Sequence, residues 1–265
     1  MDYGYQLLRH AVQQVFGNIR PAARLTLALF LTPVILFLLL TGGTGFASVA
    51  SAEAVGGGLV LALLVTVVVA VLAYCWAAVG WHRYVLLEEI GPGVFPQWRP
   101  GEVMAYLGRA IIVILVVIAG GIAAGIAVGL VVGITQSEGI AIFMGIGLVF
   151  GLTWLATRIG LVLPAAALGT RMTIGESWRA TAPVSGQILL PLIVIAAVFG
   201  LIGQVVLMIF GQTVPVETFG VVQDQVVLSL PGNLVNAVLS WLQILINLAL
   251  MTTLYGNLIE GRQLN

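Results

Sequence analysis

Long apolar runs alternate with short polar connections along the whole chain. The runs cover about 25–40 (continuing through 46), 59–79, 110–134, 140–157, 188–210 and 234–254. A helix needs about 20 predominantly apolar residues to cross the hydrocarbon core of a bilayer. The runs are apolar on every face, whereas the strands of a membrane barrel alternate between apolar and polar residues. The pattern therefore predicts an all-α polytopic membrane protein, with six transmembrane helices in one membrane domain over 1–265.

The composition supports a membrane environment. Hydrophobic residues make up 60% of the chain and charged residues 8%, whereas soluble domains carry roughly 25% charged residues. The formal net charge is zero, so no overall electrostatic attraction favours nucleic acid. We expect membrane lipid, and a second membrane protein, as the partners. The single cysteine, Cys75, stands inside an apolar run, and no Cys/His metal spacing occurs, so we expect no cofactor.

The arginines mark one side of the membrane. They precede the first run, follow the sixth, and occupy the connections between runs two and three and between runs four and five: Arg9, Arg20, Arg24, Arg83, Arg99, Arg109, Arg158, Arg171, Arg179 and Arg262. Cytoplasmic connections are enriched in basic residues. We therefore predict a bacterial inner-membrane protein with both termini in the cytoplasm. Arg158 is expected at the cytoplasmic interface, and the alternative is a longer fourth span that reaches Pro164.

Short helices are predicted before each pair of runs. Residues 5–20 form an amphipathic pattern, which favours a helix lying in the membrane interface with one apolar face: Tyr5, Leu8, Val12, Val15, Phe16 and Ile19. Residues 102–109 indicate a helix entering the third span. Thr173 and Glu176 have capping-box spacing, which predicts a helix that ends before Pro183. The recurrence suggests three helical-hairpin units, 1–83, 84–158 and 159–265.

Glycines spaced four apart form a ridge along the third run. They are Gly121, Gly125, Gly129 and Gly133. The fourth run offers Gly147 and Gly151 as a matching groove, and the connection between the two runs is short. Because association in lipid depends on close backbone approach, we predict that these glycines pack the two helices together. The alternative is that they line a pore or ligand path.

Polar side chains follow one stripe of the sixth run. They are Asn236, Ser240, Gln243 and Asn247. Amides facing lipid would be unsatisfied, so the stripe must face protein or water. Gln204 in the fifth run is the expected partner, and interhelical hydrogen bonding is the leading interpretation. A polar path for a substrate is the second. Neither histidine nor a carboxylate lies in the stripe, which argues against a proton relay.

Charged residues gather where the predicted cytoplasmic ends of the spans lie. His82, Arg83, Glu88 and Arg158 form a candidate rim for lipid headgroups. A histidine, an arginine and carboxylates are also the groups that acid–base chemistry uses. No phosphate loop, HExxH or GxSxG motif accompanies them, so a solvated helix end with headgroup-anchoring side chains is the preferred interpretation and no catalytic residue is assigned.

One segment resembles a known group of proteins. Residues 157–165 read TRIGLVLPA, with an arginine closing a span and an aliphatic run into proline, and 175–181 read GESWRAT. This resembles a broad group of bacterial six-span inner-membrane proteins, which includes the membrane domain that accompanies some glycerophosphodiester phosphodiesterases. The chain has no phosphodiesterase domain, so the resemblance implies a membrane architecture without that activity.

Three functions follow from these patterns. The leading hypothesis is a non-enzymatic inner-membrane protein that contacts or organises lipid or a membrane partner. The second is a small-molecule transporter or channel that uses the polar stripe, and the third is an intramembrane enzyme acting on lipid. A water-accessible cavity that reaches Asn247 favours the second hypothesis. A closed bundle with His82 and Glu88 facing headgroups favours the first or third.

Overall fold

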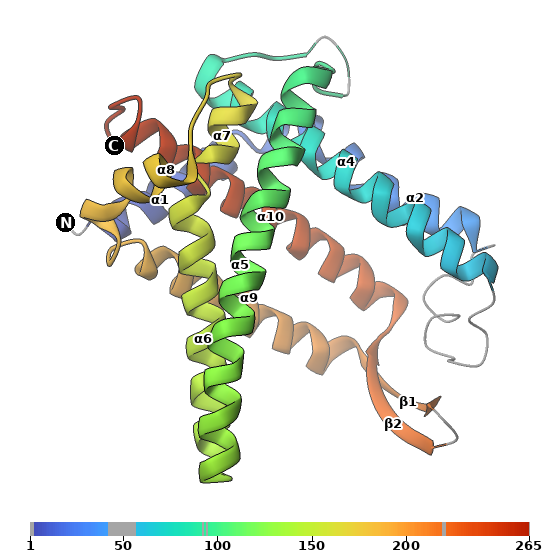
Figure 1. Ribbon diagram of the computed structural model, residues 1–265. Coiled ribbons are helices and arrows are strands. Elements are labelled where there is room, and N and C mark those ends of the chain that lie inside the picture. Colours follow the sequence, from blue (N-terminus) through green and yellow to red (C-terminus); the bar gives the residue numbers. More distant parts are fainter. Residues whose placement is uncertain (1–2, 42–56, 92, 94, 219–220, 265) are drawn as a thin grey trace.

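The computed structural model describes residues 3–41, 57–91, 93, 95–218 and 221–264 (Figure 1). Six helices within these ranges are long and apolar enough to cross a membrane, so the predicted all-α polytopic fold is confirmed. They are α2 (Ile19–Leu40), α4 (Gly57–Leu87), α5 (Pro100–Thr135), α6 (Glu138–Ile159) continued by α7 (Val162–Ala167), α9 (Leu189–Phe210) and α10 (Leu230–Leu258). Shorter helices are α1 (Tyr3–Gly17), α8 (Ile174–Ala180) and the 3-10 turn η2 (Ala182–Val184).

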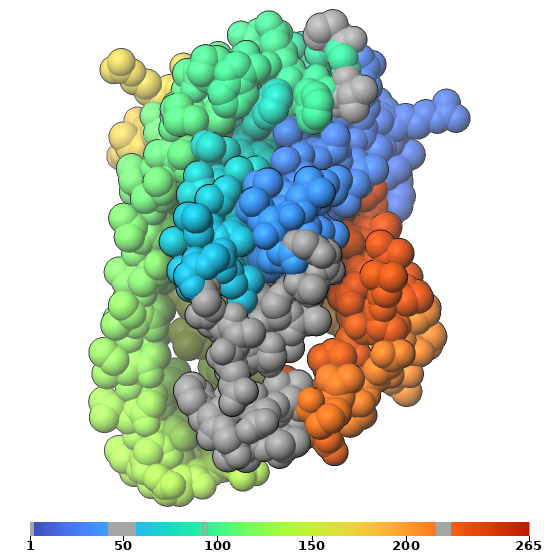
Figure 2. Space-filling view, turned by 90° about the vertical axis from the view of Figure 1, so that its right-hand side faces the viewer, coloured from blue at the N-terminus to red at the C-terminus, as the bar shows by residue number. Residues whose placement is uncertain are grey.

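Consecutive long helices pack as three antiparallel pairs: α2 with α4, α5 with α6, and α9 with α10. The pairs converge at the end of the molecule that carries both termini and diverge toward the other end (Figure 1). The space-filling view places the green α5–α6 pair and the orange to red α9–α10 pair at opposite sides of the diverging end (Figure 2). The hairpin packing agrees with the suggested units, although their relation as repeats stays a prediction.

The protein core lies at the converging end. Leu7 of α1, Trp81 of α4, Leu161, Ile188 and Leu245 of α10 are fully buried and belong to one hydrophobic cluster. The α5–α6 pair stands outside this core, because only 6% of the apolar window of α5 and none of that of α6 is buried inside the protein. Most of the surface of that pair is therefore left for the bilayer.

The first helix differs from its predicted role. It buries Leu7, Ala11 and Val15, and it packs against α9 and α10. Of the six residues expected on its apolar face, only Val15 is buried, whereas Tyr5 and Phe16 are exposed. The interfacial interpretation was therefore wrong for the buried face of α1. Small and aliphatic residues form that face, and it packs against the protein.

The connection after α6 bears out one expectation and corrects another. The capping box is present, because the Thr173 hydroxyl accepts a hydrogen bond from the Glu176 amide and the Glu176 carboxylate accepts one from the Thr173 amide. Arg158 does not sit at a free interface. It is 5% exposed, and the apolar span continues past it to Ala167, so the longer fourth span is the correct alternative.

A β-hairpin that the sequence did not predict joins α9 to α10. Strands β1 (Gly211–Thr218) and β2 (Val221–Leu228) pair antiparallel, with Gly211 opposite Leu228. Ser229 donates its amide to the carbonyl of Phe210 at 2.9 Å, which ties the end of β2 to the end of α9. The apolar run 188–210 ends where the hairpin begins, so the hydrophobic pattern located the helix end but not the strands.

The glycine ridge does not pack α5 against α6. A Cβ added at Gly121 would meet Leu152 at 3.3 Å, but at Gly125, Gly129 and Gly133 it would meet nothing within 4 Å. Gly147 and Gly151 likewise have open space beside them. Residues four apart advance by about 40° around a helix at 3.6 residues per turn, so three such steps carry the ridge about 120° away from the contact seam.

Leucine substitutions separate the two ends of the ridge. Gly121→Leu is expected to lower the free energy of unfolding by about 1–3 kcal/mol, because the side chain must enter space held by Leu152. Gly129→Leu is expected to stay within about 0.5 kcal/mol of wild type, since it points into open space. Thermal unfolding in one detergent compares them, and equal losses at both positions would restore the ridge as the packing surface.

Candidate functional site

A hollow of about 220 Å³ lies where α4, α5, α7 and α10 meet. Its lining is apolar except for three polar side chains, and consists of His82, Tyr106, Leu163, Ile244, Asn247, Leu248 and Met251. A second hollow of about 260 Å³ shares Tyr106, Ile244 and Leu248 with it, and continues toward α2 and α4. The two adjoin, so they form one cleft on the face of α10 that turns toward α4 and α5. We call this the α10 cleft.

His82 is the most deeply placed polar residue of the α10 cleft. Its side chain is 0% exposed, and its Nδ1 lies 2.8 Å from the Thr252 hydroxyl oxygen of α10. The Thr252 hydroxyl donates its one hydrogen to the Leu248 carbonyl at 2.6 Å. The same oxygen must therefore accept from His82, which places the proton of the neutral imidazole on Nδ1. The tautomer is assigned from this hydrogen-bond network.

The other imidazole nitrogen has no partner. Nε2 of His82 is buried and makes no hydrogen bond with any described residue. With the proton on Nδ1, Nε2 is a bare acceptor. Leaving such a group unsatisfied away from water costs about 1–3 kcal/mol. Other buried side-chain atoms, among them Trp81 Nε1 and Thr253 Oγ1, also have no partner among the described residues, so the unpaired nitrogen alone does not mark a ligand position.

Small residues let α4 and α10 approach closely enough to make this contact. The inward face of α10 carries Ala249, Thr252, Thr253 and Gly256, all buried. A Cβ added at Gly256 would already meet Leu86 of α4 at 3.4 Å. Thr252 bonds back to its own helix, which is the usual way a hydroxyl is satisfied inside an apolar span. The local sequence thus positions the hydroxyl that orients His82.

Tyr106 and Asn247 complete the polar lining of the first hollow. The rings of His82 and Tyr106 lie 5.8 Å apart between centroids. Tyr106 is 7% exposed, whereas Asn247 is exposed at the mouth, and neither side chain hydrogen-bonds to a described residue. No charged side chain lines either hollow. The α10 cleft therefore presents neutral hydrogen-bonding groups in apolar walls.

Arg83, one residue after His82, belongs to a separate charged network. Its guanidinium contacts the Glu89 carboxylate at 2.6 Å and donates to the Ala167 carbonyl at 3.0 Å. Arg99 pairs with the other oxygen of Glu89 at 2.8 Å, and Glu102 lies 3.9 Å from Arg83. The hydrogen bond from Arg83 is the main cause that lowers the pKa of Glu89, and the bond to Glu89 raises the pKa of Arg99.

The predicted headgroup rim is not one site. His82 is in the core, Arg83 is in the network with Glu89, and Glu88 is exposed at a left-handed turn with φ 55°. Arg158 lies on another pair of elements, where it donates to the Trp178 carbonyl at 2.7 Å and stacks 3.5 Å from the Trp178 ring. Consecutive residues of a helix point in different directions, so they enter different surroundings. The rim prediction was therefore wrong for its three buried members, His82, Arg83 and Arg158.

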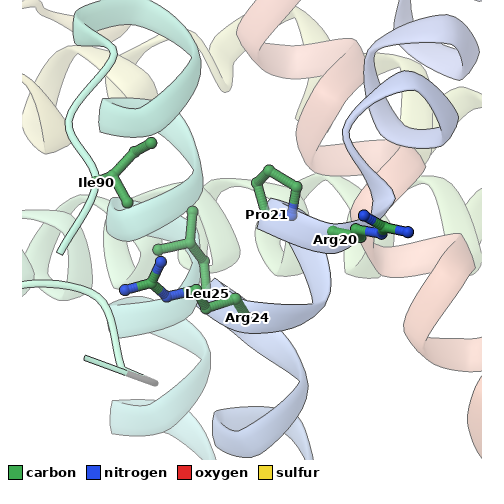
Figure 3. A pocket seen from close by; sticks show the side chains of 5 residues that line it. All are labelled: Arg20, Pro21, Arg24, Leu25 and Ile90. Atoms are coloured by element: carbon green, nitrogen blue, oxygen red, sulfur yellow. The ribbon is translucent and has the colours of Figure 1, made fainter. Parts of the chain in front are cut away.

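A basic pocket lies at the N-terminal end of α2. It encloses about 190 Å³ between Arg20, Pro21, Arg24, Leu25 and Ile90. Figure 3 shows the two guanidinium groups turned to opposite sides of its apolar centre. Arg24 donates to the carbonyls of Gly91 and Gly93 at 2.9 Å and 2.8 Å. Arg20 is exposed and has no partner among the described residues, so it remains available to an anion.

The polar stripe does not make the interhelical hydrogen bonds that the sequence predicted. Asn236, Asn247 and Gln204 are exposed, Ser240 and Gln243 are half-buried, and none of them bonds to a described residue. α10 makes its polar contacts with other spans elsewhere: Thr252 contacts His82 of α4 at 2.8 Å, and Trp241 Nε1 donates to the Thr26 hydroxyl of α2 at 2.9 Å. The Trp241 side chain, which the sequence pattern treats as apolar, thus makes an interhelical hydrogen bond that the amides of the polar stripe do not make.

Substitutions distinguish the stripe from this contact. Trp241→Phe is expected to lower the free energy of unfolding by about 1–2 kcal/mol, because one buried hydrogen bond and part of the ring contact are lost. Asn236→Leu is expected to leave stability unchanged within about 0.5 kcal/mol. Unfolding in the same detergent measures both. A clear loss in Asn236→Leu, equal to that in Trp241→Phe, would mean that the stripe joins helices.

The chain was compared with protein-family models, with curated proteins and with solved structures, and none of them matches. The site must therefore be interpreted from its own geometry. In the described residues no group of three histidine, cysteine or acidic side chains is placed to hold a metal ion. The arrangement of the α10 cleft suits non-covalent binding of a molecule that is mostly apolar and carries a neutral polar group.

Proposed function

We propose that this chain is a non-enzymatic, multi-pass protein of a bacterial inner membrane that binds a lipid or lipid-like molecule in the α10 cleft. The observation that carries the proposal is the α10 cleft itself, whose apolar walls hold His82, Tyr106 and Asn247 as the polar lining of one hollow. Sites for small ligands are typically apolar hollows with a few polar groups that fix the orientation of the ligand.

The walls of the cleft support a lipid over a water-soluble ligand. Leu163, Leu248 and Met251 surround the polar lining, and Ile244 and Asn247 at its edge are exposed. A lipid can reach such a site from the bilayer without crossing water, and it keeps its chains in apolar surroundings. Basic side chains at the pocket of Arg20 and Arg24 would add contacts to anionic headgroups at the membrane surface.

Native mass spectrometry tests this function. Wild-type protein, released from mild detergent, is expected to carry a bound lipid mass. Ile244→Trp, which places an indole between the two hollows, should lose that mass. Val238→Trp is the matched control, because Val238 is exposed on the same helix and lines neither hollow. Lipid retained equally by both variants, or absent from wild type, would contradict the proposal.

A transporter is the second candidate function. Two observations favour it: a hollow reaches Asn247, and the Asn236 and Asn247 amides are exposed on α10 without a hydrogen bond to a described residue. If these residues line a path, Asn236→Leu should abolish flux of a substrate in proteoliposomes while the bound lipid of the α10 cleft is retained. If lipid binding is the function, that substitution should change neither.

We also propose that both termini are cytoplasmic and that the chain belongs to the six-span group that it resembles. In a Cys75→Ala background, Gln212→Cys on β1 is expected to react with an impermeant thiol reagent added outside intact cells. Gln97→Cys and Gln263→Cys, which are equally exposed on the arginine-bearing side, should react only after the cells are opened. The reverse labelling would refute the orientation.

A further inference from the structure

We infer that the basic pocket at the start of α2 is a second lipid site, which binds a phospholipid with two phosphate groups, such as a cardiolipin. One phosphate contacts Arg20, the other contacts Arg24, and acyl chains cover the apolar centre between the two arginines. The inference rests on the proposed membrane location, but it does not require a lipid in the α10 cleft. It excludes water-soluble anions as the ligand, and it places phospholipids with a single phosphate behind those with two.

The pocket holds two positive charges that no carboxylate of a described residue neutralises. Arg20 has no partner among the described residues. Arg24 donates through Nε and Nη2 to backbone carbonyls only, and its Nη1 makes no hydrogen bond to a described residue. Guanidinium groups form their strongest hydrogen bonds with carboxylates and phosphates. An anion is therefore the complementary ligand of this pocket.

The two guanidinium groups stand apart, and the segment after α4 is the cause. Side chains four residues apart on a helix are neighbours, with Cβ atoms about 5–6 Å from each other, so Arg20 and Arg24 could converge on one anion. The carbonyls of Gly91 and Gly93 instead hold the Arg24 guanidinium at 2.9 Å and 2.8 Å. Figure 3 shows the Arg20 guanidinium on the other side of the apolar centre. One phosphate on Arg24 leaves Arg20 without an anion, whereas two phosphates joined by a glycerol serve both.

The apolar centre of the pocket favours a lipid over a soluble anion. It is formed by Pro21, Leu25 and Ile90. Arg24 directly precedes the apolar run that begins at Leu25, so the pocket lies at the level where headgroups meet hydrocarbon. Ile90 is 56% exposed, and acyl chains would cover it, whereas a phosphate without chains would leave it in water. Basic pockets at the ends of membrane spans are known to suit cardiolipin headgroups.

Native mass spectrometry of the full chain, stripped of lipid in detergent and titrated with cardiolipin or phosphatidylglycerol, tests the inference. We expect the wild-type protein to bind cardiolipin about fivefold more tightly than phosphatidylglycerol, the effect of one more arginine contact at a membrane surface. Arg20→Gln should lose this preference. Arg9→Gln is the matched control and should keep it, because Arg9 is also exposed without a partner among the described residues but does not line the pocket.

A soluble competitor distinguishes the lipid from its headgroup alone. Glycerol 1,3-bisphosphate carries both phosphates and no chains, and it should not displace cardiolipin. Displacement at concentrations similar to that of the lipid would overturn a lipid ligand. Equal affinity of the wild-type protein for cardiolipin and phosphatidylglycerol would overturn the assignment of two phosphates. An equal loss in Arg9→Gln and Arg20→Gln would overturn the pocket, since binding would then follow surface charge only.

The Ile244→Trp variant separates this site from the α10 cleft. It should keep the preference for cardiolipin, and a loss of cardiolipin in this variant would place the lipid in the cleft and overturn the second site. Conversely, Arg20→Gln should retain the lipid of the α10 cleft. A wild-type protein that shows the preference for cardiolipin but carries no lipid sensitive to Ile244→Trp would support the second site and contradict the proposed function of the cleft.

Discussion

Arg83→Met is expected to lower the free energy of unfolding by about 2–4 kcal/mol, the cost of removing one partner from a largely buried ion pair. Arg83 joins three elements, because it contacts Glu89 after α4 at 2.6 Å and donates to the Ala167 carbonyl at the end of α7 at 3.0 Å. The estimate lies below the highest values for buried pairs because Arg99 still holds Glu89 at 2.8 Å. Unfolding in a fixed detergent measures the loss.

Two comparisons make this prediction specific. Arg9→Met removes an arginine that is exposed and has no partner among the described residues, so it should stay within about 0.5 kcal/mol of wild type. The pKa of Glu89 is lowered in the folded protein. Its ion pair with Arg83 therefore contributes its full stabilisation of the fold at pH values above the ordinary carboxyl pKa of about 4.3. That contribution is lost as the pH falls through the lowered pKa of the folded protein. The effect of Arg83→Met should be full at neutral pH and shrink in acid, and a loss that grows in acid would contradict this network.

Gly80→Val is expected to lower the free energy of unfolding by about 3 kcal/mol, at the upper end of overpacking effects. A Cβ at position 80 would lie 2.6 Å from Cβ of Pro96 and 2.9 Å from its Cγ. The proline ring cannot rotate away as a flexible side chain would, so the loop before α5 must move. That loop also carries Glu89 and Arg99.

Gly129→Val is the matched control for the glycine at position 80. It makes the same change within a transmembrane helix, but nothing lies within 4 Å of the added Cβ. Its effect should be limited to the helix propensity difference between the two residues, a few tenths of a kcal/mol. If both valine variants unfold at the same denaturant concentration, the close approach between α4 and Pro96 is not part of the folded protein.

The sequence predicted the elements of this fold well, because single elements depend on local patterns. Long apolar runs located all six spans within the described residues, and the Thr173–Glu176 spacing located a capped helix start. The β-hairpin between α9 and α10 was missed, since eight-residue strands with polar and apolar residues on both faces have no distinctive period. The continuation of the fourth span past Arg158 was only the second alternative, because a charge usually ends an apolar run.

The faces of the helices were predicted less well, and the reason is geometric. A run that is hydrophobic on every face has no periodicity that shows which face of the helix is buried. The glycines and polar residues were therefore used to predict the buried faces of the spans. The glycine ridge drifts around α5, and the amides of the stripe on α10 make no hydrogen bond to a described residue of another helix. The buried face of α10 is instead marked by Trp241, Ala249 and Thr252, none of which differs enough from an apolar run to be noticed.

The candidate site depended on contacts that no local pattern contains. His82 was recognised as a residue of interest but was expected at a solvated helix end. Its partner, Thr252, is 170 residues away in the sequence. Only the packing of α4, α5 and α10 brings His82 and Tyr106 to one hollow.

A cryo-electron microscopy map of the protein in lipid nanodiscs tests the central claim most directly. Occupation of the α10 cleft predicts elongated density between α4, α5 and α10. It should lie against Ile244 and Leu248, which line both hollows. Density of this kind should disappear in Ile244→Trp and persist in Val238→Trp. A cleft closed by its own side chains in the wild-type protein, or one that holds isolated water peaks only, would contradict the claim.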